Sequence, residues 1–152
     1  SIGGTSDDIC NSITVDTSEN VFTTGFFNGT VDFDPNGSII NKTSNGVEDI
    51  FILKLDNNGN FGWANTIGSA TDDKGNYVIT DAQSNVYSTG YFQGTIDFDP
   101  SSSTFNLASV LKRDVYIVKY NLTGNLVWAK SFGGSKSEFG NSIALNKKSL
   151  LP

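Results

Sequence analysis

The feature that most constrains this chain is an internal repeat. When the 152-residue sequence is shifted by 65 positions, residues 2–66 align with residues 67–131 without a gap, and 27 of the 65 aligned positions are identical. A third copy begins at Phe132, where FGGSKSEFGNSIAL follows the start of the other two. Such a period indicates one supersecondary unit written several times. We therefore expect one unit at 1–66, a second at 67–131, and the start of a third, incomplete unit at 132–152.

Within each copy the apolar residues alternate with a period of two, which is typical of strands. In the first copy four runs show it: SITVD (12–16), NVFTTGFF (20–27), DIFILKLD (49–56) and NFGWANTIG (60–68). These runs are rich in β-branched and aromatic residues, and Gly, Asn and Asp clusters bound them. Each copy is therefore expected to form four antiparallel strands, with tight turns between the first and last pairs.

A longer connection, at about 28–48, joins the second and third strands and contains the phrase GTVDFDP, which returns as GTIDFDP at 94–100. We expect an extra hairpin here, with one strand at 29–34, a turn at DPNG (34–37) and a return at 38–44. The fold class is then all-β, and a twisted four-stranded sheet repeated in tandem indicates a β-propeller blade. The hairpins differ most between the copies and are expected to project and carry any partner specificity.

The phrases TGYFQGTIDFDP (89–100) and DVYIVKYNLTGNLVWAKSFGG (114–134) resemble the SBBP-type β-propeller repeats, and the resemblance covers nearly the whole chain. It implies a multi-bladed propeller, often within a large exported or surface protein of bacteria that carries adhesion modules. It implies no enzymatic activity and no fixed catalytic residues.

Two units and the start of a third are too few for a closed propeller, which has about four to eight blades. The chain is then either a fragment of a longer propeller or a homo-oligomer that completes the ring. In the second case residues 132–146 would supply a first strand to a neighbour, because open blade edges favour association.

The composition excludes several classes of function. The net charge is −6 and nine of the ten basic residues are Lys, so a nucleic-acid surface is disfavoured. No apolar run is long enough for a membrane span. The chain contains no His, which removes Ser-His-Asp triads and His-ligated zinc sites.

The repeated acidic phrase supplies the candidate metal ligands. Asp32 and Asp34 lie one residue apart, as do Asp97 and Asp99, so each pair faces one side of its strand. Hard oxygen ligands suit Ca²⁺, and calcium is the one ion that we consider here. Alternatively, Asp34 caps a turn at Asp-Pro while Asp32 pairs with a Lys or with backbone N–H groups. Recurrence in both copies favours the structural role.

Three further residue types have structural interpretations. Lys54 and Lys119 lie in an apolar strand, and we expect each to pair with an Asp of its own blade, Asp49 or Asp32 in the first copy. Trp63 and Trp128 are expected to pack between blades. Cys10, the single cysteine, is expected to be a small buried apolar residue.

The sequence therefore predicts a non-catalytic β-propeller repeat module of an exported surface protein, located outside the cell. Its role would be that of a scaffold, or of an interaction module for a protein or a glycan on a cell surface, with no required cofactor. A calcium-dependent or sugar-binding, lectin-like module is the alternative. A fragment of a carbohydrate-active propeller enzyme, using its carboxylates as acid and base, is the third hypothesis.

Overall fold

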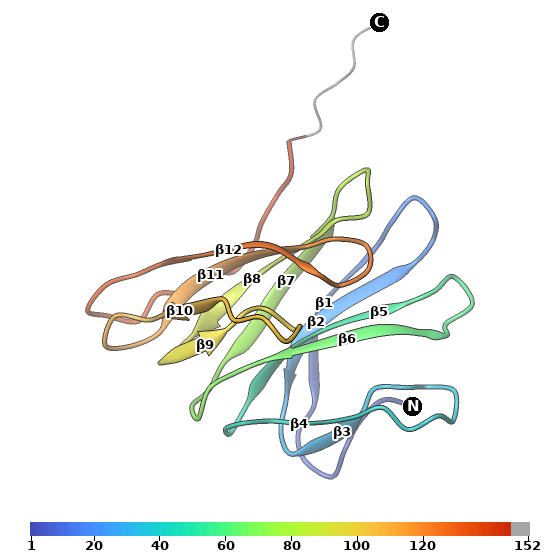
Figure 1. Ribbon diagram of the computed structural model, residues 1–152, viewed down its shortest axis with the longest axis horizontal. Coiled ribbons are helices and arrows are strands. Elements are labelled where there is room, and N and C mark those ends of the chain that lie inside the picture. The colour runs from blue at the N-terminus through green and yellow to red at the C-terminus, as the bar shows by residue number, and fades with distance from the viewer. Residues whose placement is uncertain (147–152) are drawn as a thin grey trace, which may run out of the picture.

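The computed structural model describes residues 1–146, which form two four-stranded antiparallel sheets (Figure 1). Neighbouring strands of the first sheet follow the chain, in the order β1 (Ile9–Val15), β2 (Val21–Phe27), β5 (Asp49–Leu55), β6 (Phe61–Ile67). The connection between β2 and β5 forms a separate hairpin from β3 (Thr30–Asp32) and β4 (Asn41–Thr43). This order is a simple meander interrupted once by a hairpin.

The second sheet repeats the first one 65 residues later. It contains β7 (Lys74–Thr80), β8 (Val86–Phe92), β11 (Asp114–Tyr120) and β12 (Leu126–Phe132), and its hairpin consists of β9 (Thr95–Asp97) and β10 (Asn106–Ala108). The predicted all-β fold with a hairpin between the second and third strands is confirmed. Residues 133–146 form no strand, residues 147–152 of the third unit lie outside the described residues, and the boundaries between units stay a prediction.

Tight turns at the ends of both sheets follow one rule that is visible in the sequence as D/N-x-x-x-N. Asp16 Oδ1 accepts the N–H groups of Ser18 and Asn20, both at 2.9 Å, and the Asn20 side chain donates back to Asp16 Oδ2. The turns that begin at Asp56, Asp81 and Asn121 repeat the two backbone bonds. The acidic loop DNNGN is therefore a capped hairpin turn.

A β-bulge in the first strand of each sheet ties one repeat to the next. The register of β1 shifts between Cys10 and Ser12, and that of β7 shifts at the equivalent place. The bulged residue is Asn11, whose Nδ2 donates to the Gly75 carbonyl at 2.8 Å. Bulges commonly redirect a side chain in this way. Opposite the bulge, a Cβ on Gly25 would lie only 1.8 Å from the carbonyl oxygen of Ile9, so the position requires glycine.

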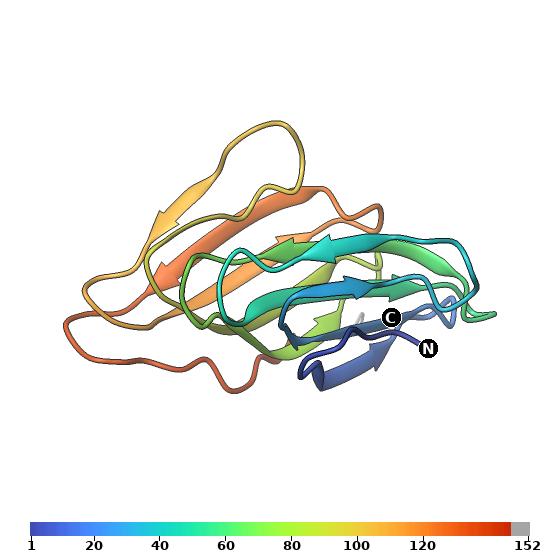
Figure 2. The same cartoon turned by 90° about the horizontal axis from the view of Figure 1, so that it is seen from below.

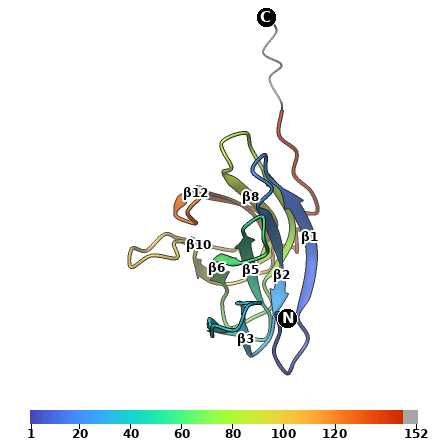
Figure 3. The ribbon, with the colours of Figure 1, turned by 90° about the vertical axis from the view of Figure 1, so that its right-hand side faces the viewer.

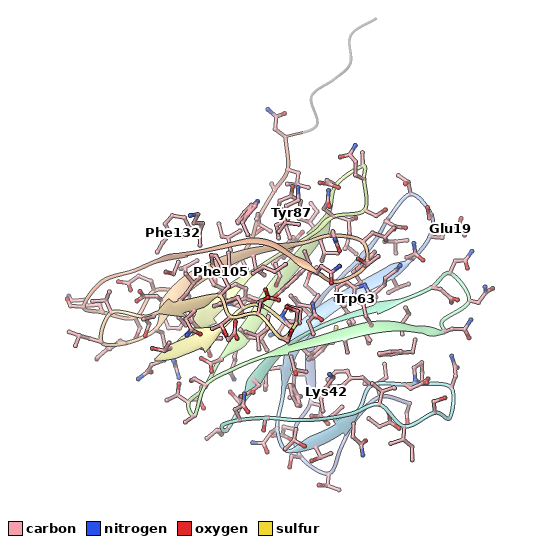
Figure 4. All side chains as sticks on the ribbon, viewed as in Figure 1. Glu19, Lys42, Trp63, Tyr87, Phe105 and Phe132 are labelled. Carbon is pink, nitrogen blue, oxygen red and sulfur yellow. The ribbon has the colours of Figure 1, made fainter. Side chains whose placement is uncertain are left out.

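The two sheets pack face to face, with β1 and β2 beside β7 (Figure 2). The shared core takes one face of each sheet: Phe22, Ile50, Ile52 and Ile67 from the first, and Val78, Val86, Tyr116, Val118 and Tyr120 from the second. Trp63 lies between the sheets, where its Nε1–H donates to the Leu122 carbonyl at 3.0 Å (Figure 4). The predicted packing of Trp63 between blades is thus confirmed.

From the sequence we expected the hairpins to project from the blades. Instead, part of each hairpin packs against a sheet. Val31 and Phe33 of the first hairpin region, and Ile96 and Phe98 of the second, are buried against the apolar face of their own sheet. The Tyr120 hydroxyl donates to the Phe98 carbonyl at 2.7 Å and fixes the second hairpin in place. Figure 3 shows both hairpins on the side away from β1. The alternation in TVDF explains this, because two side chains must go inward.

We predict that replacing Glu19 by Gly stabilises the chain. Glu19 has φ of 63°, at the turn position where Gly59 and Gly124 have φ of 80° and 84°. This region costs a residue with a Cβ about 1 kcal/mol, so Glu19→Gly should raise the free energy of unfolding by about 0.5–1 kcal/mol, measured by urea denaturation. The control Glu19→Ala keeps the strain and should give no such gain; equal gains in both variants would contradict the explanation.

Candidate interaction site

The four predicted calcium ligands all cap turns of the hairpins. Asp32 Oδ1 accepts the N–H groups of Asp34 (3.1 Å) and Ile40 (2.9 Å), and thereby joins the two sides of the hairpin. Asp34 Oδ1 accepts the N–H of Asn36 at 2.8 Å, which is the predicted Asx turn at Asp-Pro. In the second copy Asp97 and Asp99 make the equivalent bonds.

These bonds decide what the acidic phrase does in the fold. The two backbone donors hold the pKa of Asp32 below its usual value, because hydrogen bonds to a carboxylate favour its charged form. Of the two structural partners that we considered for Asp32, the structure shows backbone N–H groups. Among residues 1–146, no group of three or more Cys, Asp or Glu side chains is arranged to hold a metal ion. Calcium binding at these residues stays a prediction.

The predicted ion pair with an Asp of the same blade is confirmed for Lys119 and was wrong for Lys54. Lys119 Nζ lies 3.7 Å from Asp81 Oδ2 and over the ring of Tyr87, and the hydrogen bond to Tyr87 raises the pKa of Lys119. Lys54 lies over the ring of Phe22 instead, and within the described chain no ion pair joins it to Asp49 or Asp32. The reason is strand parity: positions 49 and 54 of one strand face opposite sides.

The paired aspartates at the start of each repeat hold the loop that enters the first strand. Asp73 is fully buried, and its carboxylate accepts hydrogen bonds from the N–H of Gln93 (2.8 Å), the N–H of Ser69 (2.6 Å) and the hydroxyl of Ser69 (2.9 Å). The pKa of Asp73 is nevertheless raised to about 6, chiefly because the carboxyl is buried and also because the carboxylate of Asp49 is nearby. Burial also raises the pKa of Asp49, which accepts the N–H groups of Asn45 and Gly46.

A partly exposed apolar surface is formed by the face of the first sheet that is turned away from the second. We call it the open face. It encloses a groove of about 260 Å³ whose lining includes Ile13, Val21, Phe33, Phe51, Leu53 and Leu55. Ile13 is 65% exposed, and this groove is therefore the candidate interaction surface of the first sheet.

Cys10 lines the same groove and is exposed, so its predicted burial was wrong. The repeat explains the error. Position 10 corresponds to Gly75, which is buried against Thr24 and Gly25 of the preceding sheet. The first sheet has no preceding sheet in this structure. Sequence reasoning recognised that both faces of the sheet are apolar and that an incomplete ring leaves blade surfaces open, but it did not place Cys10 on such a surface.

We predict that Asp32→Ala lowers the free energy of unfolding, because two partly buried backbone donors, the N–H groups of Asp34 and Ile40, lose their acceptor. Asp97→Ala should cost a similar amount, whereas Asp34→Ala, which removes one bond, should cost less. Urea denaturation measures all three. In the same samples, millimolar calcium should leave the melting temperature of the unmodified chain unchanged; a rise that Asp32→Ala abolishes would support the calcium interpretation instead.

The buried carboxylates predict an unusual dependence of stability on pH. A pKa raised in the folded state means that the Asp73 contribution is complete below pH 3.8 and is lost as the pH rises through about 6. The free energy of unfolding should therefore fall between about pH 4 and pH 7, by on the order of 1–3 kcal/mol. Asp73→Asn should flatten this slope. Asp32→Asn is the control, because its lowered pKa acts below pH 3.8 and should leave the slope intact.

A comparison with known proteins finds an uncharacterized WD repeat-containing protein of Acanthamoeba polyphaga mimivirus, 33% identical over 126 residues. The alignment covers 77% of this chain but 9% of the viral protein, so the chain spans a small part of the relative's length. No helix among residues 1–146 is long and apolar enough to cross a membrane.

The family model described as a beta-propeller repeat, SBBP, matches residues 2–25, which contain β1 and most of β2. The same pattern returns at 67–90, where the structure repeats the strands and the bulge. The match confirms the resemblance of this chain to the SBBP-type β-propeller repeat family.

Proposed function

We propose that this chain is a non-catalytic β-propeller repeat module that serves as a scaffold or interaction module in an exported surface protein of bacteria. The observation that supports it best is that side chains of the first repeat form the surface against which the second repeat packs. Asn11 and Trp63 of the first repeat donate hydrogen bonds to carbonyl groups of the second, and the two sheets share a continuous core. Side chains committed to repeat-to-repeat contact build an array and not a pocket for a substrate.

The tips of the two hairpins are the best candidates for contact with a protein or a glycan. Both hairpins bury the same two apolar positions, but their tips at 35–39 and 100–104 differ in sequence and are largely exposed. Ile39, at 74% exposure, is the most exposed apolar side chain of the first tip. A fixed base with a variable tip is the arrangement expected of a surface that changes its partner while the fold is kept.

The enzyme hypothesis has less support. It rests on the paired carboxylates of the acidic phrase, and in both copies these carboxylates accept backbone N–H groups within their own hairpin. A general acid needs a carboxyl that is free to transfer its proton to a substrate. The lectin-like alternative shares the proposed surface at the hairpin tips and differs in its ligand.

The proposed surface location predicts that protease added to intact source cells removes an epitope tag placed on the gene product that contains this chain. A cytoplasmic marker protein in the same cells should remain intact. Tag and marker should both disappear when the cells are first broken. A tag that survives on intact cells, but not in the lysate, would refute the exported location.

A further inference from the structure

Both repeats carry a charged side chain just before the third long strand of their sheet, Glu48 before β5 and Arg113 before β11. The backbone places these two residues alike. The Asp73 N–H donates to the Glu48 carbonyl, and the Glu138 N–H donates to the Arg113 carbonyl, both at 2.8 Å. Each charged residue therefore lies where the following repeat begins. We call these two places the first junction, between the two full repeats, and the second junction, between the second repeat and residues 133–146.

At the first junction an ion pair lies over an aromatic ring. Lys74 Nζ of the second repeat lies 2.5 Å from Glu48 Oε2 and 3.8 Å from the centre of the Phe26 ring. The side chains of Lys74 and Glu48 are 23% and 22% exposed, so water screens the pair less than it would in open solvent. The cation of this junction thus comes from the following repeat, whereas the anion and the ring come from the preceding one.

At the second junction the equivalent positions carry different chemistry. Phe139 stands in the place of Lys74, and the cation now comes from the preceding repeat. The guanidinium carbon of Arg113 lies 4.9 Å from the centre of the Tyr91 ring and 6.0 Å from that of Phe139. The two rings make a T-shaped contact at 5.0 Å, and Asp72 Oδ2 pairs with the guanidinium at 3.1 Å. Each junction therefore holds a cation over a ring, but the two junctions draw that cation from opposite sides.

An exchange of partners would bring together side chains that do not match. If the second repeat packed on a copy of itself, Arg113 would meet Lys74, and two cations would share the ring of Tyr91. If residues 133–146 packed on the first repeat, the Glu48 carboxylate would meet Phe139 with no cation beside it. The negative face of an aromatic ring is a poor neighbour for a carboxylate, and a partly buried charge without a partner is costly.

The other polar contacts that we compare at the two junctions are the same and do not distinguish the repeats. The Asn11 side chain donates to the Gly75 carbonyl at 2.8 Å, and the Asn76 side chain donates to the Gly140 carbonyl at 2.9 Å. The two full repeats are also identical at 27 of 65 positions. Repeats that are so similar are prone to pack in a wrong order while the chain folds. Discrimination therefore requires residues that differ between the repeats.

We propose that Glu48 with Lys74, and Arg113 with Phe139, are specificity-determining pairs that decide which repeat packs on which. They favour the native neighbour by attraction and oppose the wrong one by repulsion or by an unpaired charge, and natural interfaces use both means. This inference goes beyond the proposed function and rests on contacts within the chain. The protease experiment can therefore fail without affecting it.

The test places the side chains of a wrong junction in the full 152-residue chain and measures the melting temperature. Glu48→Arg reproduces the meeting of the second repeat with itself, because an arginine then faces Lys74. We expect it to lower the melting temperature by about 2–4 °C. Glu19→Arg is the matched control, since it changes the charge by the same amount at an exposed turn and should have a much smaller effect.

The decisive variant carries the complete pair of the second junction at the first. Glu48→Arg combined with Lys74→Phe should recover most of the melting temperature that either substitution alone removes, because an arginine then meets a ring again. Molar sodium chloride should partly restore Glu48→Arg alone by screening the like charges, and should leave the combined variant unchanged. A combined variant that loses as much as the two single variants together overturns the proposal. So does a Glu48→Arg chain that melts with the Glu19→Arg control.

Hydrogen–deuterium exchange tests the second junction separately. The N–H groups of Glu138 and Gly140 donate to the carbonyls of Arg113 and Gly90, so their exchange reports whether residues 133–146 stay in place. Phe139→Lys sets a second cation beside Arg113 and should speed this exchange by about three- to tenfold. Phe139→Leu, which removes the ring without adding a charge, should speed it less. Equal exchange in both variants would overturn the proposal for this junction.

Discussion

Each sheet in this chain is apolar on both faces, and the rest of the structure depends on that constraint. A sheet of four short strands with two apolar faces cannot be covered by one hairpin, so it needs a neighbour on at least one side. The second sheet covers the face of the first sheet that carries Phe22 and Ile52, and both side chains are fully buried. Hydrogen bonds between the repeats, from Asn11, Trp63 and Asn65 among others, accompany this apolar contact.

The acidic phrase is a consequence of the same constraint. In TVDFD the apolar members enter the core of the sheet, and the acidic members must therefore point outward. Outward they meet the backbone donors of a tight hairpin, where Asp32 accepts from two of them. One strand of alternating residues thus covers part of the apolar face and closes its own turn. Both full copies keep the phrase, and in both of them it serves these two structural functions.

The sequence was sufficient for the strands, the hairpin and the turn chemistry, because these depend on period-two alternation and on residues a few positions apart. It was insufficient wherever a side chain's environment is set by another repeat. Cys10 is exposed, although its counterpart Gly75 is buried against Thr24 and Gly25 of the preceding repeat. Strand parity alone could have excluded Asp49 as the partner of Lys54, because positions 49 and 54 of one strand face opposite sides of the sheet. The open face could also have been predicted by counting apolar faces against available neighbours.

The two ends of the described chain differ in a way that follows from the direction of the repeat. The first strand of the second repeat packs against the sheet of the first repeat. Residues 133–146 lie in the equivalent place on the second sheet, although they pair with no strand. On the first sheet the equivalent position is empty, and the hairpin residues Val31 and Phe33 cover Phe51 and Leu53 while Ile13 and Val15 stay exposed. The outward face of each sheet is therefore covered only in part, the second by residues that follow it in the chain and the first by its own hairpin.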